Sequence, residues 1–475
     1  MSTKLETAKE MGPAPKKSVK SEIANLLELE SKYCSWGDTV HYAEEIKIFD
    51  RSEGIYVYDK EGVQYLDMQM WYSAVNFGYA NKRLNDALKR QIDKLPQLAC
   101  QYLHEEKILL ATKLSQYIEK AFGVKGRVHF NVSGSYAVED SLKVIRKATG
   151  KNLVFAFMGS YHGRTLAASE ITSSYRYREP FGHFSNRANF IPYPYCFRCF
   201  YGKKKESCGM YCLKMFEKLF ESEYYTVLNK KTNKCEYGAF YIESLQGTGG
   251  YIIPPAEYFQ GLKKILDKHN ILLVDDEVQM GFFRTGKFWA IENLGITPDV
   301  IVFGKALTNG LNPISGIWAK EELISPKVWP AGMTHSTFSS NSLGTAVGLE
   351  TVKIIEESDF DKTLPKKGEY FTSLIKKLQK KYPEIGDVAS QGLIIRIEMC
   401  QKDGYAPNRE LTDKMMNIGL AGELKGPKNK NMGIIFDVGG YYKNVFTLAP
   451  SFYITEKEMD LAADLFEQAL KKALV

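Results

Sequence analysis

The sequence contains no hydrophobic run long enough to cross a membrane. Its apolar segments, such as the one ending at Ile271–Val274, are soon interrupted by charge, whereas a spanning helix needs about 20 consecutive apolar residues. The first twenty residues hold five lysines and lack the apolar stretch of a secretory signal. We therefore expect a cytoplasmic protein that does not bind membranes, with a flexible tail over residues 1–20.

Neither charge of one sign nor cysteine is abundant. The 63 basic residues exceed the 56 acidic ones by only seven, and both signs are dispersed along the chain. A nucleic-acid-binding protein concentrates its lysines and arginines on one element, so we expect no nucleic-acid partner. Eight cysteines in 475 residues do not indicate a disulfide framework in a chain without a secretory signal. We expect the cysteines to be free thiols, metal ligands or core residues.

What is present is the composition of a globular protein, with 44% hydrophobic and 13% aromatic residues. Short β-rich runs alternate with helical segments, which is typical of a mostly parallel sheet covered by helices. Strands are expected at Val128–Asn131, Leu153–Phe157, Asn189–Pro192, Ala239–Glu243, Ile271–Asp275 and Val300–Phe303. The sequence therefore predicts an α/β domain, followed after about Leu343 by an α+β unit.

Local signals indicate further elements on both sides of this domain. Before it, we expect helices at Ser21–Tyr33, Asn81–Leu95 and His104–Phe122, and a hairpin of Ile55–Tyr58 with Gln64–Asp67. After it, we expect a long helical run, strands at Gly392–Met399 and near Ile434 and Val445, and a last helix. Thr455 and Glu458 have capping-box spacing, which predicts that the last helix starts there.

A small glycine-containing turn, Ser133-Gly134-Ser135, separates the strand Val128–Asn131 from a helical pattern over Tyr136–Thr149. Free N–H groups at a helix N-terminus favour anions, so the turn is a candidate phosphate cradle. A simple helix cap is the alternative.

Carboxylates and an amine follow two successive strands of the predicted sheet. Asp275, Asp276 and Glu277 end the strand that starts at Ile271, and Lys305 follows Val300–Phe303. Parallel strands present their carboxyl ends at one edge of a sheet, where α/β proteins bind ligands. The spacing alone allows either a shared crevice or a salt bridge at the sheet edge.

Together with other segments in the same order, these motifs resemble the class-III, pyridoxal-phosphate-dependent aminotransferases, which include the 4-aminobutyrate and ornithine enzymes. The matching segments are Asn131–Ala137, Tyr161–Gly163, Glu243–Gly250, Asp276–Gln279, Gly281–Trp289, Gly304–Ala306 and Ser336–Phe338. The resemblance runs from about residue 40 to near the C-terminus. It implies fold type I, with a large cofactor domain over residues 81–345, a small α+β domain over 346–475, and an N-terminal segment, 21–80, packed on the small domain.

The resemblance implies a role for each matching residue at the cofactor ring. Lys305 resembles the lysine that binds pyridoxal phosphate as a Schiff base and later moves protons. Asp276 is similar to the residue that keeps the pyridine nitrogen protonated, and Gln279 to the one that hydrogen-bonds the ring hydroxyl. Tyr161 is expected on one face of the ring and Val278 on the other.

The phosphate end is implied in the same way. Gly134 and Ser135 are expected to donate N–H and hydroxyl hydrogen bonds, each worth about 1.5–3 kcal/mol when charge-assisted. Glu243 is counted with the cofactor-binding residues. Thr337 resembles a phosphate contact that the second subunit supplies, so a homodimer with shared active sites is expected.

Each assignment has a structural alternative. Tyr161 could be a core aromatic, Gln279 a surface amide and Thr337 a helix cap, although their joint occurrence in order favours the functional interpretation. His162 is expected either as a structural partner of its neighbours or as a contact to cofactor or substrate.

Departures from the family pattern concern the substrate. Relatives acting on ω-amino acids pair a glutamate with a C-terminal arginine that binds a carboxylate. This chain has Thr248 at the first place and, by alignment on Pro450, Phe446 at the second. We therefore expect a more apolar amine or amino acid as donor, with 4-aminobutyrate and ornithine poor. Arg396 and Arg178 are either substitutes for that cation or surface charges.

The aromatic segment Met68–Tyr72 falls where the family lines the substrate entrance, or else it belongs to the core. Four cysteines are additional to the family pattern: Cys196, Cys199, Cys208 and Cys212, separated by two, eight and three residues. Zinc is one interpretation of this spacing. A reduced, packed insertion loop over the active-site mouth is the other, and no metal ligand is assigned.

The resemblance thus implies an aminotransferase that moves an amino group from an amine or amino acid to a 2-oxo acid through Lys305. An amino-acid racemase or epimerase on the same fold is the alternative. Small-molecule substrates and a second copy of the chain are the partners expected.

Overall fold

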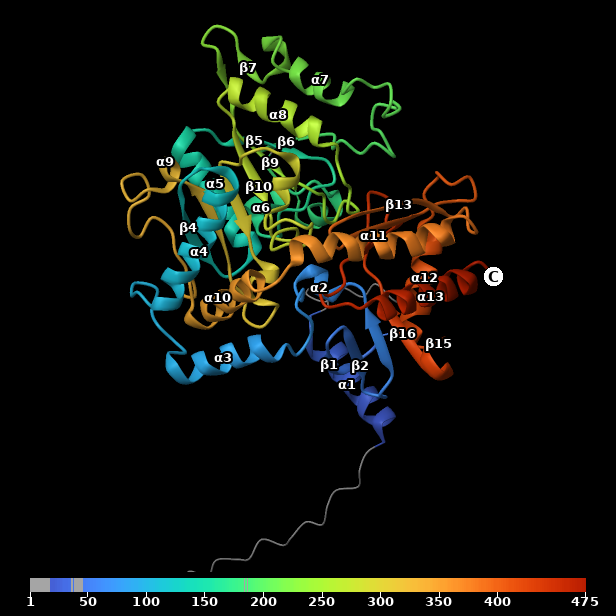
Figure 1. The fold of residues 1–475 in the computed structure, drawn as a ribbon. Coiled ribbons are helices and arrows are strands. Elements are labelled where there is room, and N and C mark those ends of the chain that lie inside the picture. Colours follow the sequence, from blue (N-terminus) through green and yellow to red (C-terminus); the bar gives the residue numbers. More distant parts are fainter. Residues whose placement is uncertain (1–17, 36, 38–45, 183, 186) are drawn as a thin grey trace, which may run out of the picture.

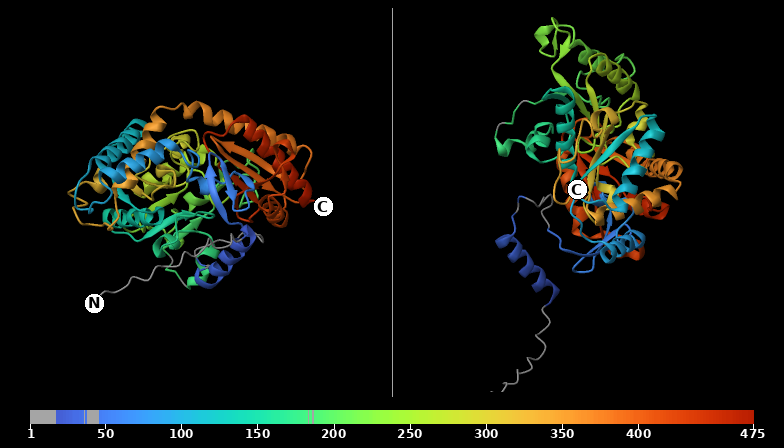
Figure 2. Two further views of the ribbon diagram at one scale, coloured as in Figure 1. Left: turned by 90° about the horizontal axis from the view of Figure 1, so that it is seen from below. Right: turned by 90° about the vertical axis from the view of Figure 1, so that its left-hand side faces the viewer.

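The computed structural model describes residues 18–35, 37, 46–182, 184–185 and 187–475. Most of the predicted tail, residues 1–17, lies outside the described residues. Helix α1 (Val19–Tyr33) confirms the first predicted helix; Ser18 caps it, accepting from the Ser21 N–H at 3.3 Å. It buries no residue and runs along the outside of the body (Figure 2).

The large sheet has seven strands in the order β4-β12-β11-β10-β9-β5-β6. Their bounds are β4 Gly126–Asn131, β5 Leu153–Phe157, β6 Ala188–Ile191, β9 Tyr237–Ile242, β10 Leu272–Asp276, β11 Val300–Phe303 and β12 Ser315–Lys320. All six predicted strands are present, and β11, β10, β9, β5 and β6 pair in parallel. The unpredicted β12 is antiparallel to both neighbours, β11 and β4.

Helices cover both faces of this sheet (Figure 1). On one face, apolar residues of α5 (Gly134–Thr149), α6 (Leu166–Glu170) and α9 (Glu321–Ile324) pack on alternate strand residues such as Val274 and Val302. On the other, α4 (Glu105–Phe122), α8 (Ala256–Lys268) and α10 (Ser342–Glu356) join the larger core. Since both faces are buried, only the sheet edges and strand ends can hold polar chemistry.

A five-stranded sheet joins the two ends of the chain in the order β1-β2-β3-β16-β15. It contains the predicted hairpin of β2 (Tyr56–Asp59) and β3 (Gln64–Asp67), preceded by β1 (Phe49–Glu53). Strand β3 pairs in parallel with β16 (Asn431–Ile435), which pairs with β15 (Leu424–Lys425). Because β3 and β16 are parallel, the segments after Asp67 and after Ile435 emerge at the same edge.

A four-stranded sheet, β13-β14-β18-β17, completes the C-terminal half. Its bounds are β13 Ile385–Gln391, β14 Ile394–Met399, β18 Val445–Leu448 and β17 Val438–Gly439. It packs with α11 (Phe360–Gln379), α12 (Arg409–Ala421) and α13 (Glu456–Ala473), and Thr455 and Glu458 form the predicted capping box. The remaining α-helices and strands are α2 Met70–Ser73, α3 Lys82–Lys94, α7 Tyr211–Lys218, β7 Leu228–Asn229 and β8 Lys234–Cys235. No helix in the described part of the chain has the length and apolar character that a bilayer span requires.

Candidate active site

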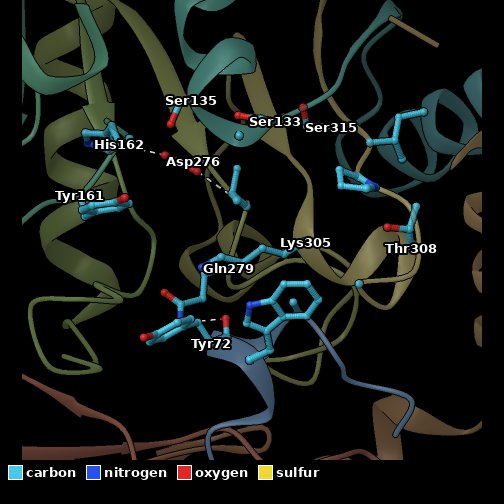
Figure 3. Close-up of a pocket in the computed structure, with 18 of the residues that line it drawn as sticks. Tyr72, Ser133, Ser135, Tyr161, His162, Asp276, Gln279, Lys305, Thr308 and Ser315 are labelled. Carbon is cyan, nitrogen blue, oxygen red and sulfur yellow. Dashed lines mark hydrogen bonds and ion pairs between the residues drawn. The ribbon is translucent and has the colours of Figure 1, made fainter. Parts of the chain in front are cut away.

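A cavity of about 330 Å³ opens at the carboxyl ends of the parallel strands. The segments that follow β4, β5, β9, β10 and β11 all contribute to its lining, as does Ser315 at the start of the antiparallel β12. The site residues predicted from the sequence that line it are Gly134, Ser135, Tyr161, Glu243, Asp276, Val278, Gln279 and Lys305. The topology thus brings together residues spread over most of the large sheet (Figure 3).

Lys305 follows β11 after Gly304 and reaches into the middle of the cavity (Figure 3). Its backbone has a φ of 42°, in the left-handed region, which costs about 1–2 kcal/mol for an L-residue. Burial lowers the pKa of its amine, while the charges of Asp276, Glu243 and Asp437 act to raise it. An amine whose pKa is lowered by burial is more often neutral and therefore more nucleophilic.

Asp276 ends β10, the strand next to β11, and its carboxylate is fixed from two sides. Its Oδ2 lies 2.9 Å from Nδ1 of His162, and its Oδ1 accepts a hydrogen bond from the Val278 N–H at 3.1 Å. His162 is fully buried at its side chain. It therefore contacts a predicted site residue and orients that carboxylate. It also lines the cavity, so a contact to cofactor or substrate stays a prediction.

Glu243, after β9, holds two loops of the site. Its Oε1 accepts from the N–H of Tyr161 at 3.0 Å and its Oε2 from the N–H of Gly247 at 2.8 Å. Burial raises the pKa of this carboxyl to about 7, and the nearby charge of Asp276 adds to the effect. The carboxylate thus fixes the backbone on either side of the cavity.

The N-terminus of α5 borders the same cavity. The N–H groups of the first turn of any α-helix lack intrahelical acceptors. Here the N-cap residue, Ser133, makes no side-chain capping bond to them either. A Cβ on Gly163 would lie 2.4 Å from Ser135 Oγ, and one on Gly134 would lie 3.1 Å from Val278 Cγ1. The glycines therefore allow neighbouring segments to pack closely against a helix end that favours anions.

Tyr161, Val278 and Gln279 form the walls of the cavity. The Gln279 amide donates to the Tyr251 hydroxyl at 3.1 Å and to the Tyr72 carbonyl at 3.4 Å. Gln279 is therefore not the surface amide of the alternative interpretation.

Comparison with known proteins identifies the family. The family model described as Aminotransferase class-III matches residues 40–470. The chain belongs to the class-III aminotransferases. It is similar to a leucine/methionine racemase of Thermococcus litoralis, at 32% identity over 94% of this chain and 95% of that protein. It is also similar to an ornithine aminotransferase of Exiguobacterium, at 29% identity over 90% of this chain and 94% of that one.

The fold agrees with this assignment. The crystal structure of a transaminase from the marine bacterium Virgibacillus aligns with a TM-score of 0.80 at 25% identity, over 94% of this chain and 99% of that one. The fold-type I prediction, with a large mostly parallel sheet, is confirmed, and as a class-III aminotransferase the enzyme depends on pyridoxal phosphate.

The donor set of the cavity fits this cofactor. An aldehyde needs an amine, and Lys305 supplies a buried one. A phosphate needs hydrogen-bond donors, which the uncapped start of α5 provides beside Gly134 and Gly163. A pyridine nitrogen needs a fixed carboxylate, and Asp276 has that form.

Thr337 is the one predicted site residue that does not line this cavity. It is exposed and lines a neighbouring cavity of about 770 Å³, which shares Val132 and Pro313 with the first. Within one chain of the aminotransferase it therefore does not reach the site.

Phe446, which aligns with the family's carboxylate-binding arginine, was expected to give an apolar contact to the substrate, but it does not line the cavity, and that expectation is wrong. Its ring packs inside the C-terminal unit, with centroids 4.8 Å from Phe436 and 5.4 Å from Phe466. Side chains alternate along β18, so Thr447 faces the other way and donates to Asp437 Oδ2 at 2.9 Å. A Cβ on Gly439 would lie 3.0 Å from both Thr447 Cγ2 and the Thr248 carbonyl oxygen, so Thr447, not Phe446, faces the Thr248 loop.

Neither arginine considered as a substitute cation lines the cavity. Arg396 is also not a surface charge, because it is only 4% exposed, pairs with Asp387 at 2.6 Å and contacts Glu398. Arg178 is half-buried and donates to the Ser173 carbonyl at 3.3 Å. In the described part of the chain, Lys305 is the only basic residue in the cavity lining apart from His162.

Sequence reasoning missed the shape of the entrance segment. Met68 and Met70 belong to the core, but Trp71 and Tyr72 line the cavity, as expected for a substrate entrance. Met70 to Ser73 form a left-handed turn with φ values of 46°, 52°, 55° and 64°. Four non-glycine residues in this conformation have no local sequence signal, since each alone disfavours it.

Asp437 was also missed. It follows β16 just as Gln69 follows β3, and the Gln69 amide donates to its Oδ1 at 3.4 Å. Burial raises the pKa of this carboxyl, while hydrogen bonds from Thr447 and Gln69 act to lower it. The parallel pairing of β3 with β16 would have revealed it, but strand pairing between the two ends of a chain cannot be read from local sequence.

Proposed function

We propose that the enzyme moves an amino group from an amino acid or amine to a 2-oxo acid, with Lys305 as the residue that holds pyridoxal phosphate. One observation carries the proposal: the buried Lys305 amine and the Asp276 carboxylate follow adjacent parallel strands and line the same cavity as the uncapped N-terminus of α5. A structural ion pair at a sheet edge would need no such cavity.

When bound, the cofactor supplies an electron-poor ring that stabilises negative charge on the carbon next to the amino group. Asp276 and His162 would hold a proton at the ring nitrogen, Gln279 would hydrogen-bond the ring hydroxyl, and Tyr161 and Val278 would confine the ring faces. The Lys305 amine would take the proton from the substrate carbon next to the amino group and deliver it to a different atom. A lowered pKa suits this role, because the neutral amine can accept a proton. Gly134 and Ser135 would bind the phosphate.

A homodimer with shared sites is part of the proposal. Thr337 lies on an exposed segment beside a cavity next to the active site, and large apolar side chains nearby are open, with Tyr102 58% and Phe338 70% exposed. A second subunit placed there would bury this apolar surface and bring its own Thr337 toward the neighbouring phosphate site.

We further propose that the donor is an apolar amino acid or amine. In the described part of the chain, the lining includes Trp71, Met280 and Ile314 but no arginine, so no guanidinium there could bind a second carboxylate. Losing a buried carboxylate clamp costs on the order of 2–5 kcal/mol for substrates that depend on one, about thirty-fold or more in specificity. Leucine should therefore exceed 4-aminobutyrate in kcat/KM; the reverse order would contradict the proposal.

The transfer itself is tested by a half-reaction. The holoenzyme mixed with donor alone should convert its cofactor to the amino form, seen by absorbance, and release one equivalent of 2-oxo acid. An unchanged spectrum with every donor of a broad panel would contradict amino transfer.

Racemisation is a second candidate, favoured by the similarity to the leucine/methionine racemase. It requires that a proton leave one face of the α-carbon and return on the other, without release of a 2-oxo acid. The diagnostic is L-leucine in D₂O: a racemase gives D-leucine carrying α-deuterium and no 2-oxo acid, whereas a transaminase stops after one equivalent of keto acid.

A further inference from the structure

Four cysteines line one small cavity that shares no lining residue with the active-site cavity. Cys196, Cys199, Cys208 and Cys212 all line a space of about 30 Å³ beside the buried Tyr193. None of the four takes part in a disulfide, and all four are half-buried. The active-site lining contains no residue of this loop in the described part of the chain, so the loop does not form the mouth of the site.

The segment that carries these thiols has no regular secondary structure, although Tyr193 and Tyr195 near its start are buried in the core. Between the end of β6 at Ile191 and the start of α7 at Tyr211, residues 192–210 form neither helix nor strand. Loops longer than about 12–15 residues without secondary structure are uncommon in compact domains. Such a loop needs side-chain or metal contacts in place of the backbone hydrogen bonds of a helix or strand.

One end of the loop is fastened by charge. Arg198, inside the first cysteine pair, contacts the buried Glu398 of β14 and donates to Cys400 Sγ at 3.4 Å. The Tyr195 hydroxyl also contacts Glu398. Among the described residues, the hydrogen bonds of the second half, 201–210, are local, such as Ser207 N–H to the Lys204 carbonyl at 3.1 Å, and Met210 packs against the core.

The thiols themselves make only weak contacts. Cys196 Sγ lies 3.9 Å from the Pro194 carbonyl oxygen, and Cys208 Sγ lies 3.5 Å from that of Lys205. Two pairs with two and three intervening residues have the spacing of structural zinc ligands, for which four thiolates form a closed tetrahedral set.

The charges around the cavity suit such a site. A zinc ion with four thiolates carries a net charge of about −2, and burying it requires compensation. Lys203 and Lys205 line the same cavity as the four thiols. Both lysines are exposed to solvent, and the Lys203 ammonium lies 5.2 Å from the centroid of the Tyr211 ring, so both can remain beside a negatively charged metal site.

We propose that Cys196, Cys199, Cys208 and Cys212 bind one structural Zn²⁺ per chain, which fixes the loop against the C-terminal sheet. Among the described residues, no three histidine, cysteine, aspartate or glutamate side chains already lie close enough together to hold a metal ion. Zinc binding therefore requires that the thiols move inward across the cavity by side-chain rotation. Each thiol that coordinates the ion loses its proton, so binding releases up to four protons and oxidises nothing. The ion takes no part in amino transfer.

The test is the zinc content of the full-length holoenzyme, expressed with added zinc and dialysed against buffer. We expect about one zinc per chain by elemental mass spectrometry, and at least a tenfold loss in a Cys208→Ser/Cys212→Ser double variant. Cys100→Ser is the matched control, because Cys100 is a half-buried thiol outside the cluster, and it should keep the zinc. Removing pyridoxal phosphate should leave the zinc content unchanged, which separates this proposal from that of the active site.

A second measurement covers the case in which the double variant does not fold. Wild-type protein expressed with cobalt should show the visible bands and sulfur-to-metal charge transfer of tetrahedral thiolate ligation. In this metal-loaded protein, the thiols of Cys196, Cys199, Cys208 and Cys212 should resist modification by a thiol reagent until a strong chelator is added. Zinc below about a tenth of an equivalent, zinc retained in the double variant, or cobalt protein without thiolate bands would each overturn the proposal.

Discussion

At the scale of single residues, the chemistry depends on where one amine is held. Lys305 sits in a left-handed conformation at a strand end, and burial lowers the pKa of its amine. We predict that Lys305→Ala abolishes both the adduct trapped by borohydride and amino transfer, the latter by several orders of magnitude. Lys320→Ala is the control, because Lys320 pairs with Asp299 at 2.7 Å, outside the cavity. A trapped adduct that persists in Lys305→Ala would mean that another lysine holds the cofactor.

Asp276 provides the second prediction at this scale. Asp276→Asn keeps a similar shape beside His162 but removes the charge that holds a proton on the ring nitrogen. We expect the variant to retain cofactor while exchange of the substrate α-proton slows by several orders of magnitude, measured by NMR in D₂O. Near-normal exchange would refute the role assigned to Asp276.

Glu243 gives a prediction about pH. Because burial raises its pKa from 4.5 to about 7, the folded state holds this proton more tightly than the unfolded state. The free energy of unfolding should therefore fall as pH rises from about 4.5 to about 7, by up to about 3 kcal/mol. Glu243→Gln, measured without cofactor by urea unfolding, should lose this component of the pH dependence. The exposed Glu410→Gln should keep it, and identical slopes in wild type and Glu243→Gln would contradict the prediction.

At the scale of elements, the phosphate cradle depends on two chain segments that approach too closely for a side chain. Gly163 has a φ of 128°, and its Cβ would lie 2.4 Å from Ser135 Oγ at the start of α5. Gly163→Ala should displace Ser135 and weaken pyridoxal phosphate binding by at least tenfold, measured by fluorescence titration. Gly123→Ala shares a positive φ, at 69°, but has nothing within 4 Å. It should lose stability only, by about 1 kcal/mol, and equal cofactor affinity in both variants would contradict this.

Element boundaries in the sheet were predictable because each buried strand is a short apolar run between turns, as in Leu153–Phe157 and Val300–Phe303. Strand β12 was not predicted, since Ser315–Lys320 combines small, apolar and charged residues and gains its place only by pairing between β11 and β4. The left-handed turn of Met70–Ser73 was likewise beyond local signals.

At the scale of the whole molecule, the site is predicted to be incomplete in one chain, because Thr337 is exposed and outside the cavity. Lys305→Ala chains and Thr337→Arg chains should each be inactive. When they are mixed and allowed to exchange subunits, hybrid dimers should regain activity, because one of their two sites has both an intact Lys305 and an intact Thr337. Up to about a quarter of wild-type activity is expected, since random exchange makes half the dimers hybrid. Full activity in a fraction that elutes as a monomer would contradict the shared site.

The sequence by itself determined the family and predicted eight of the residues that line the cavity. Lys305, Asp276 and the start of α5 could be assigned because strand ends and helix starts have local signals, and because ordered motifs are specific in combination. The domain boundaries and the cytoplasmic location stay predictions.

The tertiary structure decided which side chains line the cavity and which face away from it. The direction of a side chain on β18 depends on strand register, and a shift of one residue replaced Phe446 by Thr447 on the face toward the Thr248 loop. Asp437 comes near enough to act on the charge of Lys305 only through the parallel pairing of β3 with β16, between segments more than three hundred residues apart. Local propensity carries no information about such pairings, because the contacts that select them form only when the whole chain has folded.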